Sequence, residues 1–126
     1  MTVVVQSSDA ALSDLVAVTR PAIEGWATAV GCGYAFVCPP KAHPYAYKFF
    51  AVSRLLGDGA DAVIWVDADV VPIKMGPIGP FDRELAVSQD YHGHCLGVFL
   101  VRNTPWVRSW CSFMAQTIPL EPVYRT

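Results

Sequence analysis

Two aspartates one residue apart are the part of this sequence best suited to chemistry. Asp67 and Asp69 directly follow an apolar run at residues 62–66. In an extended segment, residues i and i+2 point the same way, so both carboxylates can face one point, where they repel unless a cation or a proton lies between them. Hard oxygen ligands of this kind suit Mg²⁺ or Mn²⁺, which usually also bind water and phosphates. The alternative is a strand that simply ends in solvated acids, because a D-x-D triplet arises easily by chance.

The elements around this pair must place it where a ligand can reach it. The uninterrupted apolar run at 62–66 predicts a central strand covered on both faces. Further strands are predicted at residues 2–5, 34–37, 85–88 and 97–101. Helical patterns alternate with them, which is typical of an α/β domain with a mainly parallel sheet flanked by helices. Ligands of such sheets gather beyond the carboxyl ends of the strands, where Asp67 and Asp69 would lie.

The segment after the first strand is interrupted by Pro21. Since proline suits the first turn of a helix and breaks its interior, we expect a fresh helix to begin at Pro21, to present Ile23 and Trp26 on its apolar face, and to stop at Gly31. Three prolines and two glycines between residues 72 and 80 predict a loop, with room for one short strand.

Two further helices are predicted from apolar residues at helical spacing. The first opens at His43-Pro44, after Pro39-Pro40 has closed the preceding strand, and its predicted apolar face comprises Tyr45, Phe49, Val52 and Leu56. The second begins with Thr104 as its cap and Pro105 in its first turn. Its predicted apolar face comprises Trp106, Trp110, Phe113 and Met114. We expect both faces to pack in the core.

Length and composition limit the function classes. A chain of 126 residues fits one domain. Hydrophobic residues make up 53% and charged residues only 16%, below the usual charged share of about 25%, so a substantial core is expected. The formal net charge is -2 without any run of like charges, which argues against nucleic acid or an anionic membrane as a partner. Four cysteines without C-x-x-C spacing are expected to be buried thiols: Cys32, Cys38, Cys95 and Cys111.

No membrane-spanning or secretory segment is expected. Charged residues interrupt the apolar stretches well short of the roughly 20 residues that span a bilayer. No basic segment followed by an apolar one comes after Met1. We therefore expect a cytoplasmic protein, or, if the chain is a piece of a longer anchored enzyme, a domain of the Golgi lumen.

One enzyme class with such an aspartate pair is the haloacid-dehalogenase type of phosphatase. Residues 63–71 match its hhhDxDx(T/V) signature, in which one aspartate is a nucleophile that forms an aspartyl-phosphate. The resemblance is local, because that family places the motif at the start of its domain and also needs a downstream lysine and a further pair of acids. After Asp69 the chain offers Lys74 and four acids that form no adjacent pair: Asp82, Glu84, Asp90 and Glu121. This interpretation comes second.

The other class is the GT-A glycosyltransferases, whose D-x-D carboxylates hold a metal that bridges the diphosphate of a nucleotide sugar. Residues 43–48 (HPYAYK), 62–69 (AVIWVDAD) and 97–106 (GVFLVRNTPW) resemble the galactosyl- and xylosyltransferases related to fungal mannan and plant xyloglucan enzymes. That family's pattern runs H-P-x-W-x-K, a helix, W-x-D-x-D, then N-x-G-x-F-L-x-R-N-x-x-W. The resemblance covers roughly positions 43 to 110, and residues 2–8 fit the family's nucleotide-binding first strand.

The resemblance implies a single Rossmann-like GT-A domain over residues 1–126 that binds a nucleotide-diphosphate sugar, favouring a UDP-sugar. It implies that Asp67 and Asp69 hold Mn²⁺ or Mg²⁺ and the diphosphate, with Asp69 as the direct metal ligand and Ala68 between them in the donor site. Ser7 and Ser8 would then lie near the base or ribose of the nucleotide, although both also fit an ordinary loop.

The resemblance implies three further donor contacts. Lys48 would neutralise donor phosphate, against the alternative of a solvated surface lysine. Gly97 would let the backbone approach the donor sugar; the alternative is that glycine serves a bulge or close strand packing there. Asp90 would present a catalytic carboxylate to the donor sugar; the alternative is that Asp90 lies in a solvated turn. His92 and His94 could add a metal ligand, although histidines in such a loop are more often surface residues.

The chain departs from the family pattern in two places. Cys95-Leu96-Gly97 stands where the family has Asn-x-Gly. The family also continues past its last helix into an acidic-amide motif, an acceptor subsite and often a metal-binding histidine, whereas this sequence ends at Thr126 after Pro119 and Pro122. We expect a glycosyltransferase for a carbohydrate or glycoconjugate acceptor. The short length fits a truncated paralogue, a fragment, or a minimal member whose acceptor site a second copy or a partner chain completes. The alternative is a catalytically weak or inactive nucleotide-sugar-binding module.

Overall fold

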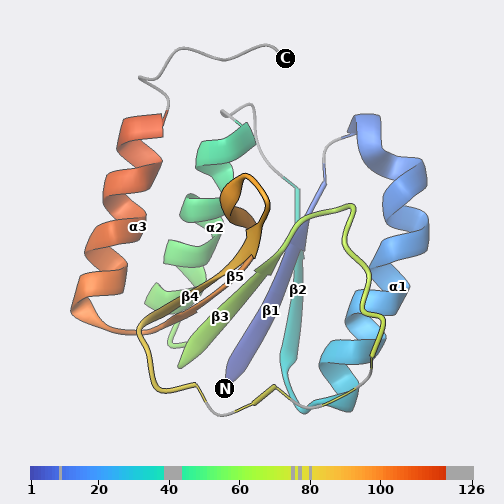
Figure 1. Ribbon diagram of the computed structural model, residues 1–126, viewed down its shortest axis with the longest axis horizontal. Coiled ribbons are helices and arrows are strands. Elements are labelled where there is room, and N and C mark those ends of the chain that lie inside the picture. The colour runs from blue at the N-terminus through green and yellow to red at the C-terminus, as the bar shows by residue number, and fades with distance from the viewer. Residues whose placement is uncertain (9, 39–43, 75, 77, 80, 119–126) are drawn as a thin grey trace.

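The computed structural model describes residues 1–8, 10–38, 44–74, 76, 78–79 and 81–118, and shows a sheet between helices (Figure 1). His43, Pro39, Pro40, Pro119, Pro122 and Glu121 lie outside the described residues. In chain order the elements are β1 (Thr2–Ser7), the 3₁₀ turn η1 (Ala10–Leu12), α1 (Ser13–Ala29), β2 (Gly33–Val37), α2 (Pro44–Gly57), β3 (Ala62–Val66), β4 (Leu85–Asp90), β5 (Gly93–Arg102) and α3 (Pro105–Thr117).

The five strands form one sheet in the order β2-β1-β3-β5-β4, so β3 is central. β2, β1 and β3 pair in parallel, β5 is antiparallel to both of its neighbours, and four strands therefore run in the same direction. The prediction of a mainly parallel α/β sheet flanked by helices is confirmed. Apolar side chains of the two helices α2 and α3 pack on one face of the sheet, and α1 packs on the other (Figure 1).

Helix α1 differs from the prediction because it runs without a break through Pro21. Proline removes one helical hydrogen bond, and Pro21 lies on the exposed side of the helix. Burial on both sides of Pro21 holds the helix together, because Thr19 and Ile23 belong to one buried stripe against the sheet. The expected end at Gly31 is correct within a turn, and Gly31 adopts a positive φ of 77°.

The buried face of α2 includes Phe49, Val52 and Leu56 as predicted, but Tyr45 is 64% exposed. Helix α3 begins as predicted, with the Thr104 hydroxyl accepting the amide of Val107 at 3.2 Å. Its predicted apolar face is wrong in part.

On α3 the fully or nearly fully buried positions are Val107, Cys111 and Ala115, whereas Trp106 is 50% and Phe113 is 62% exposed. Small side chains let α3 approach α2 closely. Trp110 is half-buried at the edge of this contact, with its ring edge-on to Phe49 at a centroid distance of 5.3 Å. Among the cysteines, Cys111 is buried, Cys32 and Cys95 are partly buried and Cys38 is exposed, so the expectation of buried thiols is met in full at Cys111 and is wrong at Cys38.

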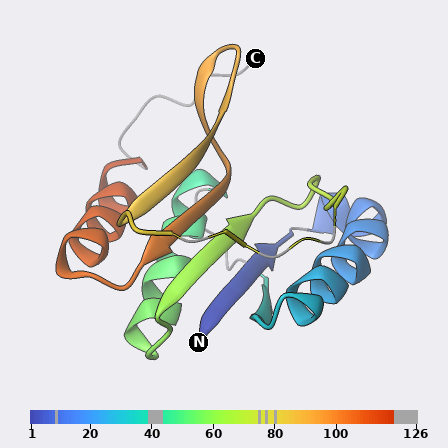
Figure 2. The ribbon, with the colours of Figure 1, turned by 60° about the horizontal axis from the view of Figure 1, so that its bottom comes forward.

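Strands β4 and β5 are longer than predicted and form a hairpin that extends beyond the rest of the sheet (Figure 2). Val87 pairs with Phe99 and the next residue, Ser88, pairs with Cys95, so residues 96–98 of β5 bulge out of this pairing. The described residues between 72 and 80 lie in no helix or strand, as expected. No helix in the described part of the chain is long and apolar enough to cross a membrane.

Candidate functional site

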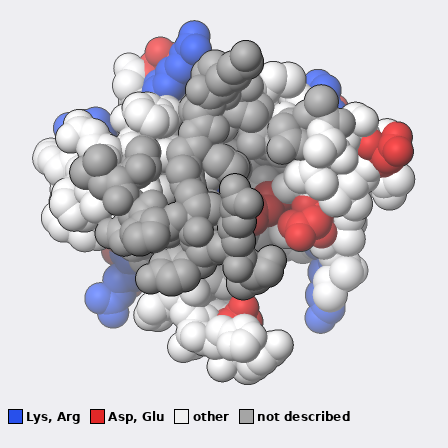
Figure 3. Space-filling view, turned by 90° about the horizontal axis from the view of Figure 1, so that it is seen from above, with Lys and Arg blue, Asp and Glu red and all other residues white. Residues whose placement is uncertain are grey.

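A pocket of about 300 Å³ lies at the carboxyl edge of β1 and β3. Its wall combines the end of β1, the start of α1, the first turn of α2 and the end of β3, which the topology brings together. The lining residues are Ser7, Ser8, Leu12, Leu15, Tyr45, Tyr47, Lys48, Trp65, Asp67, Ala68 and Asp69. Figure 3 looks onto this edge and shows acidic side chains exposed near its middle.

The pocket unites six of the residues that the sequence singled out. These are Ser7, Ser8, Lys48, Asp67, Ala68 and Asp69. They come from three segments far apart in the chain. Parallel strands place their carboxyl ends at one edge, and the first turn of α2 closes the side of the pocket.

Asp67 is held by two donors on one of its oxygens. The indole Nε1 of Trp65 donates to Oδ1 at 2.6 Å, and Lys48 Nζ donates to the same oxygen at 3.3 Å. Oδ2 of Asp67 takes part in neither of these hydrogen bonds. The carboxylate therefore has a defined orientation before any ligand arrives.

Lys48 is only 8% exposed, so the alternative of a solvated surface lysine is wrong. Besides Asp67, its ammonium donates to the carbonyl of Leu96 at 3.0 Å. It also lies 5.6 Å from the centroid of the Trp65 ring. A buried ammonium is stable only when it is paired and hydrogen-bonded, and these partners meet that need. Lys48 thus supplies a fixed positive charge at the wall of the pocket.

Gly97 lies in the β5 bulge directly against Asp67. Its carbonyl accepts the amide of Asp67 at 2.8 Å. A Cβ at this position would lie 3.3 Å from Oδ2 of Asp67 and 3.4 Å from Sγ of Cys95, which is tighter than ordinary contact. The structure therefore supports the interpretation of Gly97 as a bulge residue with close packing, while its contact with a donor sugar stays a prediction.

A buried polar chain that the sequence analysis missed lies behind the pocket. Tyr34 OH donates to Gln6 Oε1 at 3.0 Å, Gln6 Nε2 donates to the hydroxyl of Thr19 at 3.2 Å, and Thr19 donates to the carbonyl of Ala68 at 2.7 Å. Burial raises the pKa of Tyr34, an effect that the nearby Arg20 partly offsets. The available signal was a glutamine within an otherwise apolar strand.

The donor set fits a divalent metal that is shared with a ligand. Among the described residues, no group of three or more His, Cys, Asp or Glu side chains is placed to hold a metal ion. These side chains alone therefore do not form a complete metal site. Asp67 and the exposed Asp69 offer two carboxylates. Mg²⁺ and Mn²⁺ are commonly bound by one or two carboxylates together with water and the phosphates of a substrate.

The structure does not bring Asp90 to this pocket. Asp90 ends β4 at the hairpin turn, where its Oδ1 accepts the amide of His92 at 2.8 Å. Asp90, His92 and His94 are all exposed. The carboxylate thus has a local role in shaping the turn, and its catalytic role stays a prediction.

No family model and no curated protein matches the sequence. Among solved structures, a match is described as a glycosyltransferase involved in the glycosylation of the major capsid of PBCV-1. The TM-score is 0.75 at 13% identity, and the match covers 96% of this chain and 68% of that chain. The chain shares the fold of this glycosyltransferase. At this identity the likeness concerns the fold, and the galactosyl- and xylosyltransferase resemblance stays a prediction.

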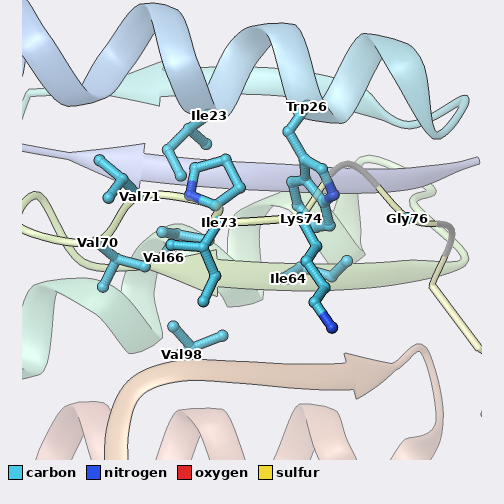
Figure 4. Close-up of a pocket in the computed structure, with 11 residues that line it drawn as sticks. Ile23, Trp26, Ile64, Val66, Val70, Val71, Ile73, Lys74, Gly76 and Val98 are labelled. Atoms are coloured by element: carbon cyan, nitrogen blue, oxygen red, sulfur yellow. The ribbon is translucent and has the colours of Figure 1, made fainter.

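A second, larger cavity of about 510 Å³ lies on the face of the sheet that α1 covers. Figure 4 shows Ile23 and Trp26 of α1 opposite Ile64 and Val66 of β3, with Val98 of β5 at the far side. The segment from Val70 to Lys74 lies across it. This lining is almost entirely apolar, so the charged pocket at Asp67 and Asp69 is better suited to a phosphorylated ligand.

Proposed function

We propose that this protein is a metal-dependent GT-A glycosyltransferase that uses a nucleotide-diphosphate sugar, favouring a UDP-sugar, to glycosylate a carbohydrate or glycoconjugate. The observation that carries the proposal is the convergence of Ser7, Ser8, Lys48, Asp67 and Asp69 in one pocket at the carboxyl edge of the sheet. The glycosyltransferase fold of the matching structure supports it.

Each of these residues would contact a different part of the bound metal and nucleotide diphosphate. Asp69 and the free oxygen of Asp67 would bind Mn²⁺ or Mg²⁺, and when bound this metal stabilises the negative charge that builds on the departing diphosphate. The ammonium of Lys48 adds a fixed charge on the same wall. Ser7 and Ser8, at the end of β1, would face the ribose or base of the nucleotide.

The pocket is less suited to the phosphatase alternative. In that chemistry an aspartate oxygen attacks phosphorus, which the bonds of Trp65 and Lys48 to Oδ1 of Asp67 leave possible at Oδ2. That chemistry also needs further acids beyond the motif. None of the described acids after Asp69 lines the pocket.

The donor pocket leaves no further acid among the described residues for binding an acceptor. The acids that line the pocket are Asp67 and Asp69, and both are assigned to the metal. We therefore propose that a second copy or a partner chain completes the acceptor site. A nucleotide-sugar-binding module with weak or no transfer activity is the alternative.

The decisive experiment is calorimetric titration with UDP and with GDP, each with and without Mn²⁺. We expect the wild type to bind UDP only when Mn²⁺ is present. Asp69→Ala should weaken this binding by about tenfold or more, because it removes a charged metal ligand. Asp58→Ala is the matched control, because Asp58 is also exposed but follows α2 at the opposite edge of the sheet.

Binding that is independent of Mn²⁺, or equal in the two variants, would contradict the proposed donor site. Release of free sugar from UDP-sugars in the same samples then separates an enzyme from a binding module. If neither nucleotide binds, hydrolysis of small phosphoesters tests the phosphatase alternative.

A further inference from the structure

Thr19 makes an unusual hydrogen bond for a threonine within a helix. A helical threonine often returns its hydroxyl to a carbonyl one turn earlier, as Thr28 of the same helix does with Glu24 at 3.0 Å. Thr19 instead donates across to the backbone carbonyl of Ala68, 49 residues away, at 2.7 Å. Its bond therefore ties α1 to the residue between the two aspartates.

The direction of this bond is set by the groups behind it. A hydroxyl has one proton to donate, and Thr19 gives it to Ala68 because Gln6 Nε2 donates to the Thr19 oxygen at 3.2 Å. The amide of Gln6 is oriented in turn by Tyr34 OH, which donates to its Oε1 at 3.0 Å. Gln6 and Thr19 are both buried, so water does not compete for these bonds.

The anchored residue controls the two carboxylates on either side of it. The side chain of Ala68 is buried and its carbonyl is held by Thr19. Asp67 is fixed on its own side by Trp65 and Lys48. Asp69 is exposed and has neither support from the described residues. The turn at Asp69 is closed by the Val70 amide, which donates to the Asp67 carbonyl at 3.2 Å.

We infer that Thr19, oriented by Gln6 and Tyr34, is a positioning residue for the Asp67-Ala68-Asp69 segment. It sets the direction in which Asp69 leaves the end of β3 and does not itself touch the ligand. The inference rests on the proposed function only for its effect on metal binding. The geometry of the segment is a property of the protein without ligand.

The first test measures backbone order in the ligand-free chain by ¹⁵N relaxation. In Thr19→Val, which keeps the shape but loses the hydroxyl, we expect the order parameters of the Ala68 and Asp69 amides to fall from about 0.85 toward about 0.6. Those of Ile64 in β3 should not change. Thr19→Ser keeps the hydroxyl and Thr28→Val alters an exposed hydroxyl of the same helix, so both should retain wild-type values.

The second test is Mn²⁺ titration of the same variants in the presence of UDP, because the proposed site shares its metal with the diphosphate. Loss of a group that orients a metal ligand typically weakens metal binding by roughly 10–100-fold, which we expect for Thr19→Val and not for Thr19→Ser. Tyr34→Phe removes the hydrogen bond farthest from Ala68, together with the contact between the Tyr34 hydroxyl and Arg20, and should lower the same two order parameters less. It serves as the second variant should Thr19→Val fail to fold.

The inference is overturned if the order of Ala68 and Asp69 in Thr19→Val matches the wild type, or if it falls together with that of Ile64 as in general destabilisation. Should Thr19→Val not fold, wild-type order at Ala68 and Asp69 in Tyr34→Phe overturns it. A wild type that binds no Mn²⁺ even in the presence of UDP contradicts the proposed function instead, and the relaxation measurement still decides the role of Thr19.

Discussion

Asp67 has little freedom, because protein groups surround its carboxylate. Trp65 and Lys48 bind one oxygen, and the backbone of Gly97 lies against the other. Side chains arranged in this way can bind a cation without first losing much conformational entropy. Asp69, by contrast, is exposed and receives its geometry from the backbone that Thr19 anchors.

Gly97→Ala tests this arrangement. The added methyl group would lie 3.3 Å from Oδ2 of Asp67, so the carboxylate must shift by a few tenths of an ångström. We expect Mn²⁺-dependent UDP affinity, measured by calorimetry, to fall by roughly three- to tenfold, a typical loss for small displacements of ligand groups.

Gly25→Ala is the control for Gly97→Ala. Gly25 lies within α1 with nothing within 4 Å of an added Cβ. It should leave UDP affinity unchanged and raise the free energy of unfolding by about 0.5–1 kcal/mol, because alanine favours a helix interior. Equal UDP affinity in the Gly97 variant and the wild type would refute the crowding argument.

Helix α1 shows how tertiary packing overrides a local sequence signal. Pro21 predicts a break, but the buried stripe through Val16, Thr19, Ile23 and Ala27 runs along the whole helix and anchors both halves to the sheet. This continuity matters for the site. The half of α1 before Pro21 carries Thr19, which reaches Ala68.

Pro21→Ala should therefore stabilise the protein. The substitution restores an amide donor in an exposed helix interior, where proline costs up to about 3 kcal/mol relative to alanine. We expect the free energy of unfolding, measured with urea, to rise by about 1–3 kcal/mol. Pro105→Ala at the start of α3 is the control and should bring no such gain, since proline suits that position. An unchanged midpoint in Pro21→Ala would mean that α1 is already adapted to the proline.

The core formed by α2, α3 and the sheet contains an ionisable group at its centre. Cys111 is fully buried there, and burial raises the pKa of its thiol from 9.0 to about 11. Below pH 9 the thiol is neutral in both the folded and the unfolded chain. Between pH 9 and 11 the unfolded chain loses this proton first, which favours unfolding.

We therefore predict that the free energy of unfolding falls as the pH rises from 9 to 11, with up to about 2–3 kcal/mol due to Cys111. Cys111→Ala should show a shallower decline across this interval in denaturant titrations at several pH values. Cys38→Ala changes an exposed thiol and should follow the wild type. Identical slopes in Cys111→Ala and the wild type would show that Cys111 does not cause the loss.

Much of the architecture could be predicted from local patterns. Hydrophobic periodicity among neighbouring residues was enough to predict the strand at residues 62–66 and the helix with Phe49, Val52 and Leu56. The cap at Thr104 likewise depends on a hydrogen bond to a residue only three positions away. The position of Asp67 and Asp69 at the end of a buried strand followed from the same patterns. Residue types at this spacing also indicated a cation-binding edge.

Other features depended on contacts between residues distant in the chain. The buried partners of Lys48, the chain from Tyr34 to Ala68 and the continuity of α1 all arise because the sheet brings β1, β2 and β3 side by side. The exposure of Trp106 and Phe113 likewise follows from which face of α3 enters the core, namely that of Val107, Cys111 and Ala115. A linear pattern shows which residues are apolar or can donate a hydrogen bond, but the partner that satisfies each one is chosen when the whole core packs.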